Sequence, residues 1–167
     1  MNDRARWAFG VALCNFCVAG LGIAGCGARE PAPADTRNEL ASLPATSELD
    51  PHGWKVITSA IHRNDGTMST LFGNDIAVKA SRAGQMPYPP GADLSWVTWA
   101  SQEDAHWFGA KIPGKVQSVE RVRFETAGGQ PSYDKYEGSP WTKHAVEPAA
   151  AAERVAYIVR QRASVMP

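Results

Sequence analysis

Acidic and histidine side chains are the residues of this sequence that could bind a metal ion, and three of them lie close together. Glu103, Asp104 and His106 bring two carboxylates and an imidazole within four residues, and such oxygen and nitrogen ligands suit several divalent metals. Three closely spaced ligands still need a partner from elsewhere to complete the coordination, so a polar loop that closes a hairpin is the favoured interpretation. In that interpretation Trp107 and Phe108 pack beneath the loop.

Tryptophan is the second group of interest, because five of the six tryptophans lie after residue 50. One interpretation is an aromatic ligand pocket formed by Trp54, Trp96, Trp99 and Trp107. The other is ordinary core packing, which is favoured for any single ring; a pocket that uses at least two of them is an equal alternative. The sequence carries no Ser/His/Asp series, phosphate-binding glycine loop or dinucleotide fingerprint, so these chemistries are not predicted.

Three cysteines lie near the N-terminus, and their setting decides their role. Cys14 and Cys17 have the spacing of a redox pair, but both lie in the uncharged stretch 7–25, which follows two arginines as in a secretion signal. The stretch ends in Ile-Ala-Gly before Cys26 and resembles the lipobox of bacterial lipoproteins. We therefore expect residues 1–25 to be a signal peptide and Cys26 to carry the lipid. The alternative is an uncleaved helix with an incidental cysteine.

The segment after the lipobox is rich in proline, alanine and small polar residues, which predicts a flexible tether over 26–50 and one domain over 51–167. Acyl chains on Cys26 would hold the protein on a membrane, so the expected location is the bacterial cell envelope, facing the periplasm. Gly27 follows the cysteine where an aspartate would favour the inner membrane, and this favours the outer membrane. Basic and acidic side chains number 17 each, so nucleic acid is not an expected partner.

Alternation of apolar and polar residues between turn signals predicts about five strands. They are expected over residues 54–61, 67–72, 93–99, 116–125 and 133–137. Asn74 predicts the N-cap of a short helix over 75–83, after the first hairpin. Pro148 is expected to open an amphipathic C-terminal helix within 149–163. This order of elements predicts an α+β fold built on an antiparallel sheet.

The same alternation assigns faces within two of the strands. Trp96 is expected on one face of the third strand and Trp99 on the opposite face. In the fourth strand, Val116 and Val122 are expected to share a face.

Three segments resemble the cytochrome P460 family: 53–57 (GWKVI), 73–79 (GNDIAVK) and 88–92 (YPPGA), the last leading into a tryptophan-bearing strand. The resemblance covers roughly residues 51–138 and rests on order and spacing. It implies a small exported haem protein with an antiparallel sheet and few helices, often a dimer. Founding members bind c-type haem and oxidise hydroxylamine or nitric oxide, whereas a related branch of similar fold only binds gases.

Two covalent features mark the founding enzymes of that family. One is a CxxCH motif near the C-terminus; no cysteine follows Cys26, so either haem is not attached in this way or the attachment segment lies beyond Pro167. The other is a lysine cross-linked to the porphyrin, and Trp96 stands at the matching position. Haem is then expected only if it binds noncovalently. His62 is the best-placed axial ligand, although an exposed turn histidine is the favoured interpretation.

Three functional hypotheses follow. The first is a lipid-anchored envelope protein whose cytochrome P460-like domain lacks covalent haem anchors and binds a small ligand or a partner. The second is a noncovalent haem oxidoreductase that acts on hydroxylamine or nitric oxide. The third is an interaction module that forms a homodimer. Fold analogy names no substrate for any of them.

Overall fold

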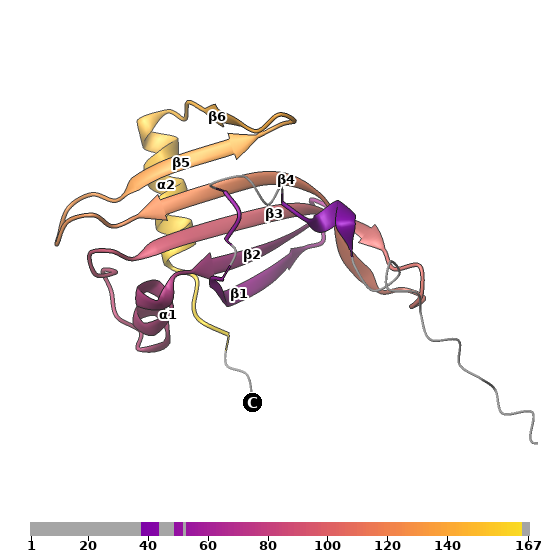
Figure 1. Ribbon diagram of the computed structural model, residues 1–167, viewed down its shortest axis with the longest axis horizontal. Helices are drawn as coiled ribbons and strands as arrows, with labels where there is room; N and C mark the ends of the chain where they lie inside the picture. Colours follow the sequence, from indigo (N-terminus) through magenta and orange to yellow (C-terminus); the bar gives the residue numbers. More distant parts are fainter. Residues whose placement is uncertain (1–37, 44–48, 52, 165–167) are drawn as a thin grey trace, which may run out of the picture. The chain divides into compact units, whose positions relative to one another are not determined.

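Six antiparallel strands form one sheet in which every strand pairs with its neighbours in sequence. The computed structural model describes residues 38–43, 49–51 and 53–164, and the sheet order is β1-β2-β3-β4-β5-β6 (Figure 1). The strands are β1 (Lys55–His62), β2 (Thr67–Gly73), β3 (Asp93–Glu103), β4 (Lys111–Arg123), β5 (Ser132–Glu137) and β6 (Thr142–His144). The predicted α+β fold on an antiparallel sheet is thus confirmed, with six strands where about five are predicted.

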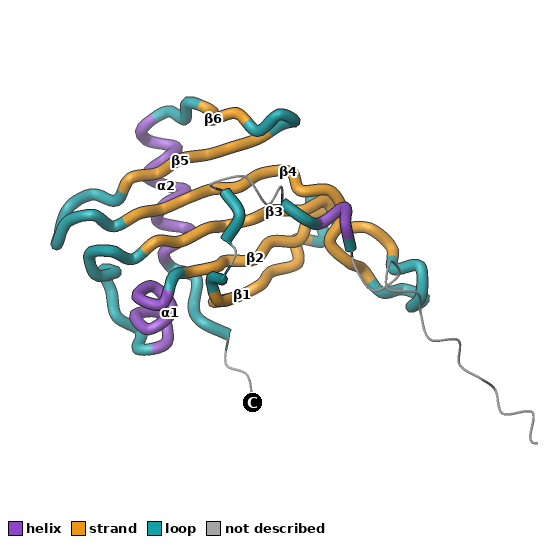
Figure 2. Tube along the Cα trace, viewed as in Figure 1, coloured by secondary structure: helices purple, strands orange, loops and turns teal. Residues whose placement is uncertain are grey.

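Two α-helices and one short 3-10 helix complete the described chain. Helix α1 (Asp75–Arg82) follows the first hairpin, and α2 (Pro148–Val159) follows the last strand. Figure 2 shows α2 running across the strands on one face of the sheet. The 3-10 helix η2 (Glu39–Ala41) precedes the sheet in sequence. No helix in the described part of the chain has the length and apolarity needed to cross a bilayer.

Each face of the sheet has its own core, and β3 contributes a tryptophan to both. On the face covered by the two α-helices, Trp96 packs with Leu71, Val122 and Ile158, all of them almost fully buried. On the other face Trp99 packs with a second apolar cluster. The alternation predicted for the third strand is therefore observed.

The second core is closed by residues from the predicted tether. Leu49 is 6% exposed, and the indole Nε1 of Trp99 donates to the carbonyl of Ala41 at 2.9 Å. Ala41, Leu43 and Leu49, which belong to the predicted tether over 26–50, thus pack on the sheet, because the few apolar residues of this segment have a sheet face to cover. The predicted signal peptide and Cys26 lie outside the described residues.

A β-bulge in β4 overturns one assignment of faces. Thr98 pairs with Ser118 and the next residue, Trp99, pairs with Val116, so that Gln117 is extra in β4. The extra residue reverses the alternation before it. Val116 therefore joins the Trp99 cluster while Val122 lies in the Trp96 cluster, and the prediction that both share a face is wrong.

Asn74 caps α1 as predicted and also joins it to β3. Its Oδ1 accepts from the backbone N–H of Ala77 at 2.9 Å and of Asp93 at 3.3 Å, and its Nδ2 donates to the carbonyl of Gly91 at 2.7 Å. One side chain thus ties the helix start to the turn that precedes β3.

Replacement of Asn74 by alanine is expected to lower the free energy of unfolding by about 2 kcal/mol, the upper end for loss of an N-cap, because two further backbone groups lose their partner. Urea unfolding followed by circular dichroism measures this loss. Asn74→Ser is the matched control, since its hydroxyl keeps an accepting oxygen at the N-cap and loses the amide donor to Gly91. An equal loss in both variants would contradict the capping role of the oxygen.

Candidate functional site

The four tryptophans of the predicted pocket do not share one cavity. Trp96 and Trp99 lie in cores on opposite faces of the sheet. Trp54 lies 5.4 Å from the guanidinium carbon of Arg121. Trp107 is 73% exposed. Trp96 and Trp99 are core residues, in line with the interpretation of a single tryptophan as ordinary core packing.

His62, the proposed axial ligand, lies at the end of β1 and is half-buried. Its ring centroid lies 6.5 Å from that of Trp96 in a tilted arrangement. A shallow cavity of about 390 Å³ adjoins it, lined only by His62 and its neighbours in the β1–β2 turn. The imidazole therefore lies beside the Trp96 core but opens toward the turn.

The acidic and histidine cluster forms the turn between β3 and β4. Lys111 pairs with the carboxylate of Glu103, and Oδ1 of Asp104 accepts from the backbone N–H of His106 at 2.8 Å. Across the described residues, no three histidine, cysteine, aspartate or glutamate side chains are placed to hold a metal ion. The contacts of Glu103, Asp104 and His106 are those of a polar loop. Trp107 and Phe108 do not pack beneath it, which corrects that part of the prediction: both are exposed.

A buried ion pair lies between the sheet and α2. Glu120 of β4 is 3% exposed. Arg154 of α2 donates two hydrogen bonds to its carboxylate, from Nε to Oε2 at 2.7 Å and from Nη2 to Oε1 at 2.9 Å. The hydroxyl of Tyr133 donates to Oε2 at 2.7 Å. This bidentate geometry, with a third donor, satisfies the carboxylate without water.

Arg154 also covers the aromatic rings of this core. Its guanidinium carbon lies 4.7 Å from the ring centroid of Tyr157 and 5.8 Å from that of Trp96, and Tyr157 meets Trp96 edge-on at 5.6 Å. We call Trp96, Glu120, Tyr133, Arg154 and Tyr157 the buried cluster. They come from β3, β4, β5 and α2 and meet between the sheet and the helix.

The charges of the buried cluster hold its protons in place. Burial and the hydrogen bond to Glu120 raise the pKa of the Tyr133 hydroxyl far above its usual range. Burial alone would lower the pKa of Arg154, but its hydrogen bonds and charge interaction with Glu120 raise it. The tyrosine thus stays protonated and the arginine charged across the physiological range, so the cluster has the character of a structural network rather than of an acid–base pair.

A second ion network lies on the opposite face of the sheet. Asp134 of β5 is 7% exposed and accepts from Arg123 and Lys143 at 2.5 Å each. Burial raises the pKa of the Asp134 carboxyl, but the hydrogen bonds and charges of Lys143 and Arg123 outweigh it and hold the pKa below its usual value of 3.8. The network stabilises the end of the sheet where β4, β5 and β6 meet.

This depressed pKa predicts how stability depends on pH. The carboxylate of Asp134 is favoured in the folded state, so its contribution is complete above about pH 5 and is lost as the pH falls through 3.8 and below. We expect Asp134→Asn to lower the free energy of unfolding by about 1 kcal/mol at neutral pH, since both partners are partly exposed and screened. Urea titrations should show this difference shrinking toward acid pH; a difference that stays constant would exclude the ion network as its source.

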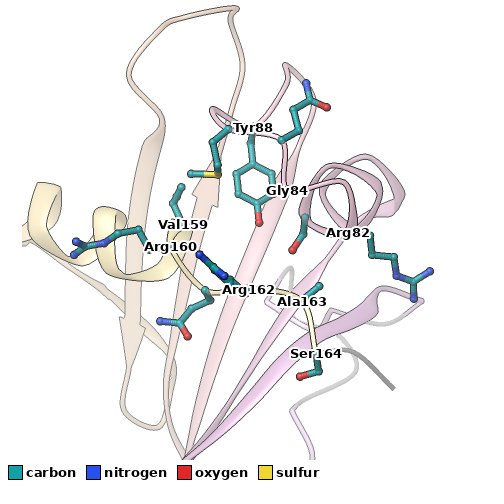
Figure 3. Close-up of a pocket in the computed structure, with 12 residues that line it drawn as sticks. Arg82, Gly84, Tyr88, Val159, Arg160, Arg162, Ala163 and Ser164 are labelled. Carbon is teal, nitrogen blue, oxygen red and sulfur yellow. The ribbon is translucent and has the colours of Figure 1, made fainter. Parts of the chain in front are cut away.

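A cavity larger than the one beside His62 has neither His62 nor any tryptophan in its lining. It has a volume of about 760 Å³ and lies between the end of α1, the following loop and the tail after α2. We call it the tail pocket; its lining includes Ser81, Arg82, Met86, Tyr88, Arg160 and Arg162. Figure 3 shows the Tyr88 hydroxyl and Arg162 directed toward the middle of the pocket, whereas Arg82 and Arg160 extend away from it.

The polar groups of the tail pocket are only partly used by the protein. Arg160 Nε donates to the carbonyl of Ala156 at the end of α2. Neither Arg82 nor Arg162 forms an ion pair with any described carboxylate. Among the same residues the buried hydroxyl of Ser81 has no hydrogen-bond partner. A pocket with an aromatic wall, a buried hydroxyl and unneutralised guanidinium groups suits an organic anion.

None of the candidate site residues predicted from the sequence lines the tail pocket. Its members come from two segments far apart in the chain: 81–88, which ends α1 and continues into the loop, and 159–164, which ends α2 and continues into the tail. The only local signal of an anion site was the pair Arg160 and Arg162. Basic residues near the C-terminus of a helix have another explanation, since they interact favourably with the helix dipole.

The comparison with known families gives one match. The family model described as Cytochrome P460 covers residues 51–152, which includes all six strands and the start of α2. No curated protein sequence matches the chain.

Proposed function

Since the chain belongs to the cytochrome P460 family, we propose that it is a lipid-anchored envelope protein whose domain binds a small organic anion in place of haem. The family normally binds haem, so the residues of this chain must be tested against that group first. The proposal therefore rests on the buried cluster, which occupies the face where the resemblance places the porphyrin.

The residues on that face do not fit a haem. Trp96, at the position of the family's cross-linking lysine, is 1% exposed. Two side chains of α2 cover its ring: the ring centroid of Tyr157 lies 5.6 Å from that of Trp96, and the guanidinium carbon of Arg154 lies 5.8 Å from it. A porphyrin could enter only by displacing α2 and leaving Glu120 buried without its arginine, which is strongly unfavourable. This single observation carries the proposal.

The tail pocket supports the ligand class. It has room for a drug-sized molecule, and its arginines and aromatic wall match a carboxylate, sulfonate or phosphate carried on an apolar group. No histidine lines it, so the usual imidazole ligand of haem is not at hand there.

Hemin titration tests the loss of haem binding. We expect purified mature protein to give no stoichiometric absorption band near about 400 nm, the region of haem's strongest absorption, when hemin is added. A stoichiometric band that disappears in His62→Ala and persists in the matched control His106→Ala would overturn the proposal. It would favour the second hypothesis, a noncovalent haem oxidoreductase.

Benzoate serves as the probe for the tail pocket, because it joins one carboxylate to one aromatic ring. Saturating benzoate is expected to raise the Tm of the wild-type protein by linkage. Arg162→Gln should remove most of the rise, while Arg63→Gln, on the exposed β1–β2 turn, should retain it. A rise that both variants share would place binding outside the pocket.

The proposed location in the cell envelope rests on the lipobox-like segment that ends at Cys26. The preference for the outer membrane rests on Gly27. Mass spectrometry of the mature N-terminus is expected to find an acylated Cys26, and Cys26→Ser should move the protein from the membrane to the soluble fraction. Recovery of unprocessed residues 1–25 in the membrane fraction would support an uncleaved helix instead.

A further inference from the structure

The turn between β3 and β4 presents two large aromatic side chains to solvent. Trp107 is 73% exposed and Phe108 is fully exposed, with a relative exposure of 109%. They are adjacent in sequence and lie at the end of the longest hairpin of the sheet. Single exposed apolar residues are ordinary on protein surfaces, but a pair at a projecting tip is a candidate contact site.

Hydrogen bonds hold this turn in a defined shape. We call residues 104–110 the hairpin tip. Within it the N–H of Asp104 donates to the carbonyl of Ala110, and the N–H of Ala110 donates to the carbonyl of Trp107, both at 3.0 Å. Oδ1 of Asp104 accepts from the N–H of His106 at 2.8 Å. The aromatic pair is therefore presented by an ordered turn.

The hairpin also projects beyond the rest of the sheet. β2 pairs with β3 only as far as Ala100, and β5 pairs with β4 only from Ser118 onward. Past these points β3 and β4 pair with each other alone, as Figure 1 shows where the two strands run on beyond their neighbours. Nothing in the described chain covers the hairpin tip.

The described chain begins at the base of this hairpin. Asn38 donates through Nδ2 to the carbonyl of Pro113 in β4 at 2.6 Å, and Ala41 accepts from Trp99 of β3. Asn38 lies twelve positions after Cys26, and a chain of that length spans at most about 40 Å. A lipid on Cys26 would thus keep the base of the hairpin within that distance of the membrane surface.

We infer that the hairpin tip is a second membrane contact, in which Trp107 and Phe108 enter the interfacial layer of the bilayer that holds the lipid anchor. Tryptophan favours this layer because its ring is apolar and its N–H can reach water or a headgroup. At the base of the tip Lys111 neutralises Glu103, and Asp104, the one carboxylate of the tip, accepts from the backbone N–H of His106. A second attachment point would restrict the orientation of the domain on the membrane. The inference rests on the proposed lipidation of Cys26.

Fluorescence quenching by brominated lipid tests the contact in the full mature protein. The lipidated protein is reconstituted into phosphatidylethanolamine and phosphatidylglycerol vesicles that contain lipid brominated on its acyl chains. We expect the wild-type emission to be quenched and Trp107→Phe to lose most of that quenching. Trp141→Phe is the matched control, because Trp141 packs against the Trp99 core, and it should keep the quenching.

Vesicle sedimentation of the Cys26→Ser protein tests the same surface without the anchor. Partition is expected to fall at least about tenfold in Phe108→Ala, the factor that corresponds to withdrawing a large apolar side chain from the bilayer. Ile61→Ala, which removes another exposed apolar residue, from β1 (61% exposed), should leave partition unchanged.

The outcomes separate the surface from the anchor. If Cys26 proves not to be acylated while the Cys26→Ser protein still binds vesicles through Phe108, the proposed anchor fails and the surface stands. Equal quenching in the wild type and Trp107→Phe would overturn the inference. So would a concentration-dependent mass by light scattering that Phe108→Ala abolishes in the absence of quenching, because the tip would then join two copies of the chain.

Discussion

Replacement of Arg154 by alanine is expected to lower the free energy of unfolding by about 2–3 kcal/mol. Removing one partner of a fully buried ion pair typically costs about 3–5 kcal/mol, because the other charge stays buried without compensation. Here Glu120 is the charge left behind, with a side chain 4% exposed, whereas 35% of the Arg154 side chain remains exposed and part of the pair is screened. The expected loss is therefore below the usual range.

Urea unfolding of three variants separates the causes of that loss. Arg154→Lys keeps the positive charge but loses the two-pronged geometry, so it should recover only part of the stability. The double variant Glu120→Leu/Arg154→Met should recover most of it, because an apolar pair of similar size leaves no buried charge. If Arg154→Ala were as stable as the wild type, the cluster would not hold α2 on the sheet.

The sequence predicted those parts of the fold that depend on near neighbours. Strand alternation around Trp96, the N-cap at Asn74 and the proline that opens α2 are all signals within a few residues, and the structure has each of them. Register was less accessible. The bulge at Gln117 depends on how β4 meets β3, and β6 is a three-residue strand that forms only because β5 offers it an edge.

The buried cluster and the tail pocket were harder to predict because their members meet only after folding. Glu120 lies 34 positions from Arg154, and neither residue carries a local signal that points to the other. Strand alternation places Trp96 and Trp99 on opposite faces and so already excludes a pocket that holds both. Residue type alone, which suggested the pocket, carries no information about the face of the sheet on which each ring lies.

The position of Trp96 connects the fold to the proposed loss of haem. The family's lysine would reach from β3 toward the porphyrin, and the same position here carries a large ring packed under α2. Under the proposed function, one substitution of this kind would both remove an anchor and fill the place it served. The family's sheet would then be kept while the haem site on it is closed.

Replacement of Trp96 by alanine is expected to have the largest effect on stability, a loss of about 3–5 kcal/mol in the free energy of unfolding. The ring is 1% exposed, so its removal loses apolar burial and leaves a cavity beneath α2, beside Tyr157 and Arg154. Urea unfolding measures the loss. Trp107→Ala is the matched control, because that ring is 73% exposed and its removal should change stability by less than about 0.5 kcal/mol.

Addition of indole distinguishes a cavity from a general disruption. Indole should restore part of the stability of Trp96→Ala, since a cavity lined by aromatic residues can bind a ligand of the shape it lost, and it should not affect the wild type. The cavity is the size of one indole and far smaller than a porphyrin, so Trp96→Ala should still give no stoichiometric band with hemin. Hemin binding by this variant through His62 would instead mean that Trp96 alone blocks the family's haem site, and that the rest of that site is intact beneath α2.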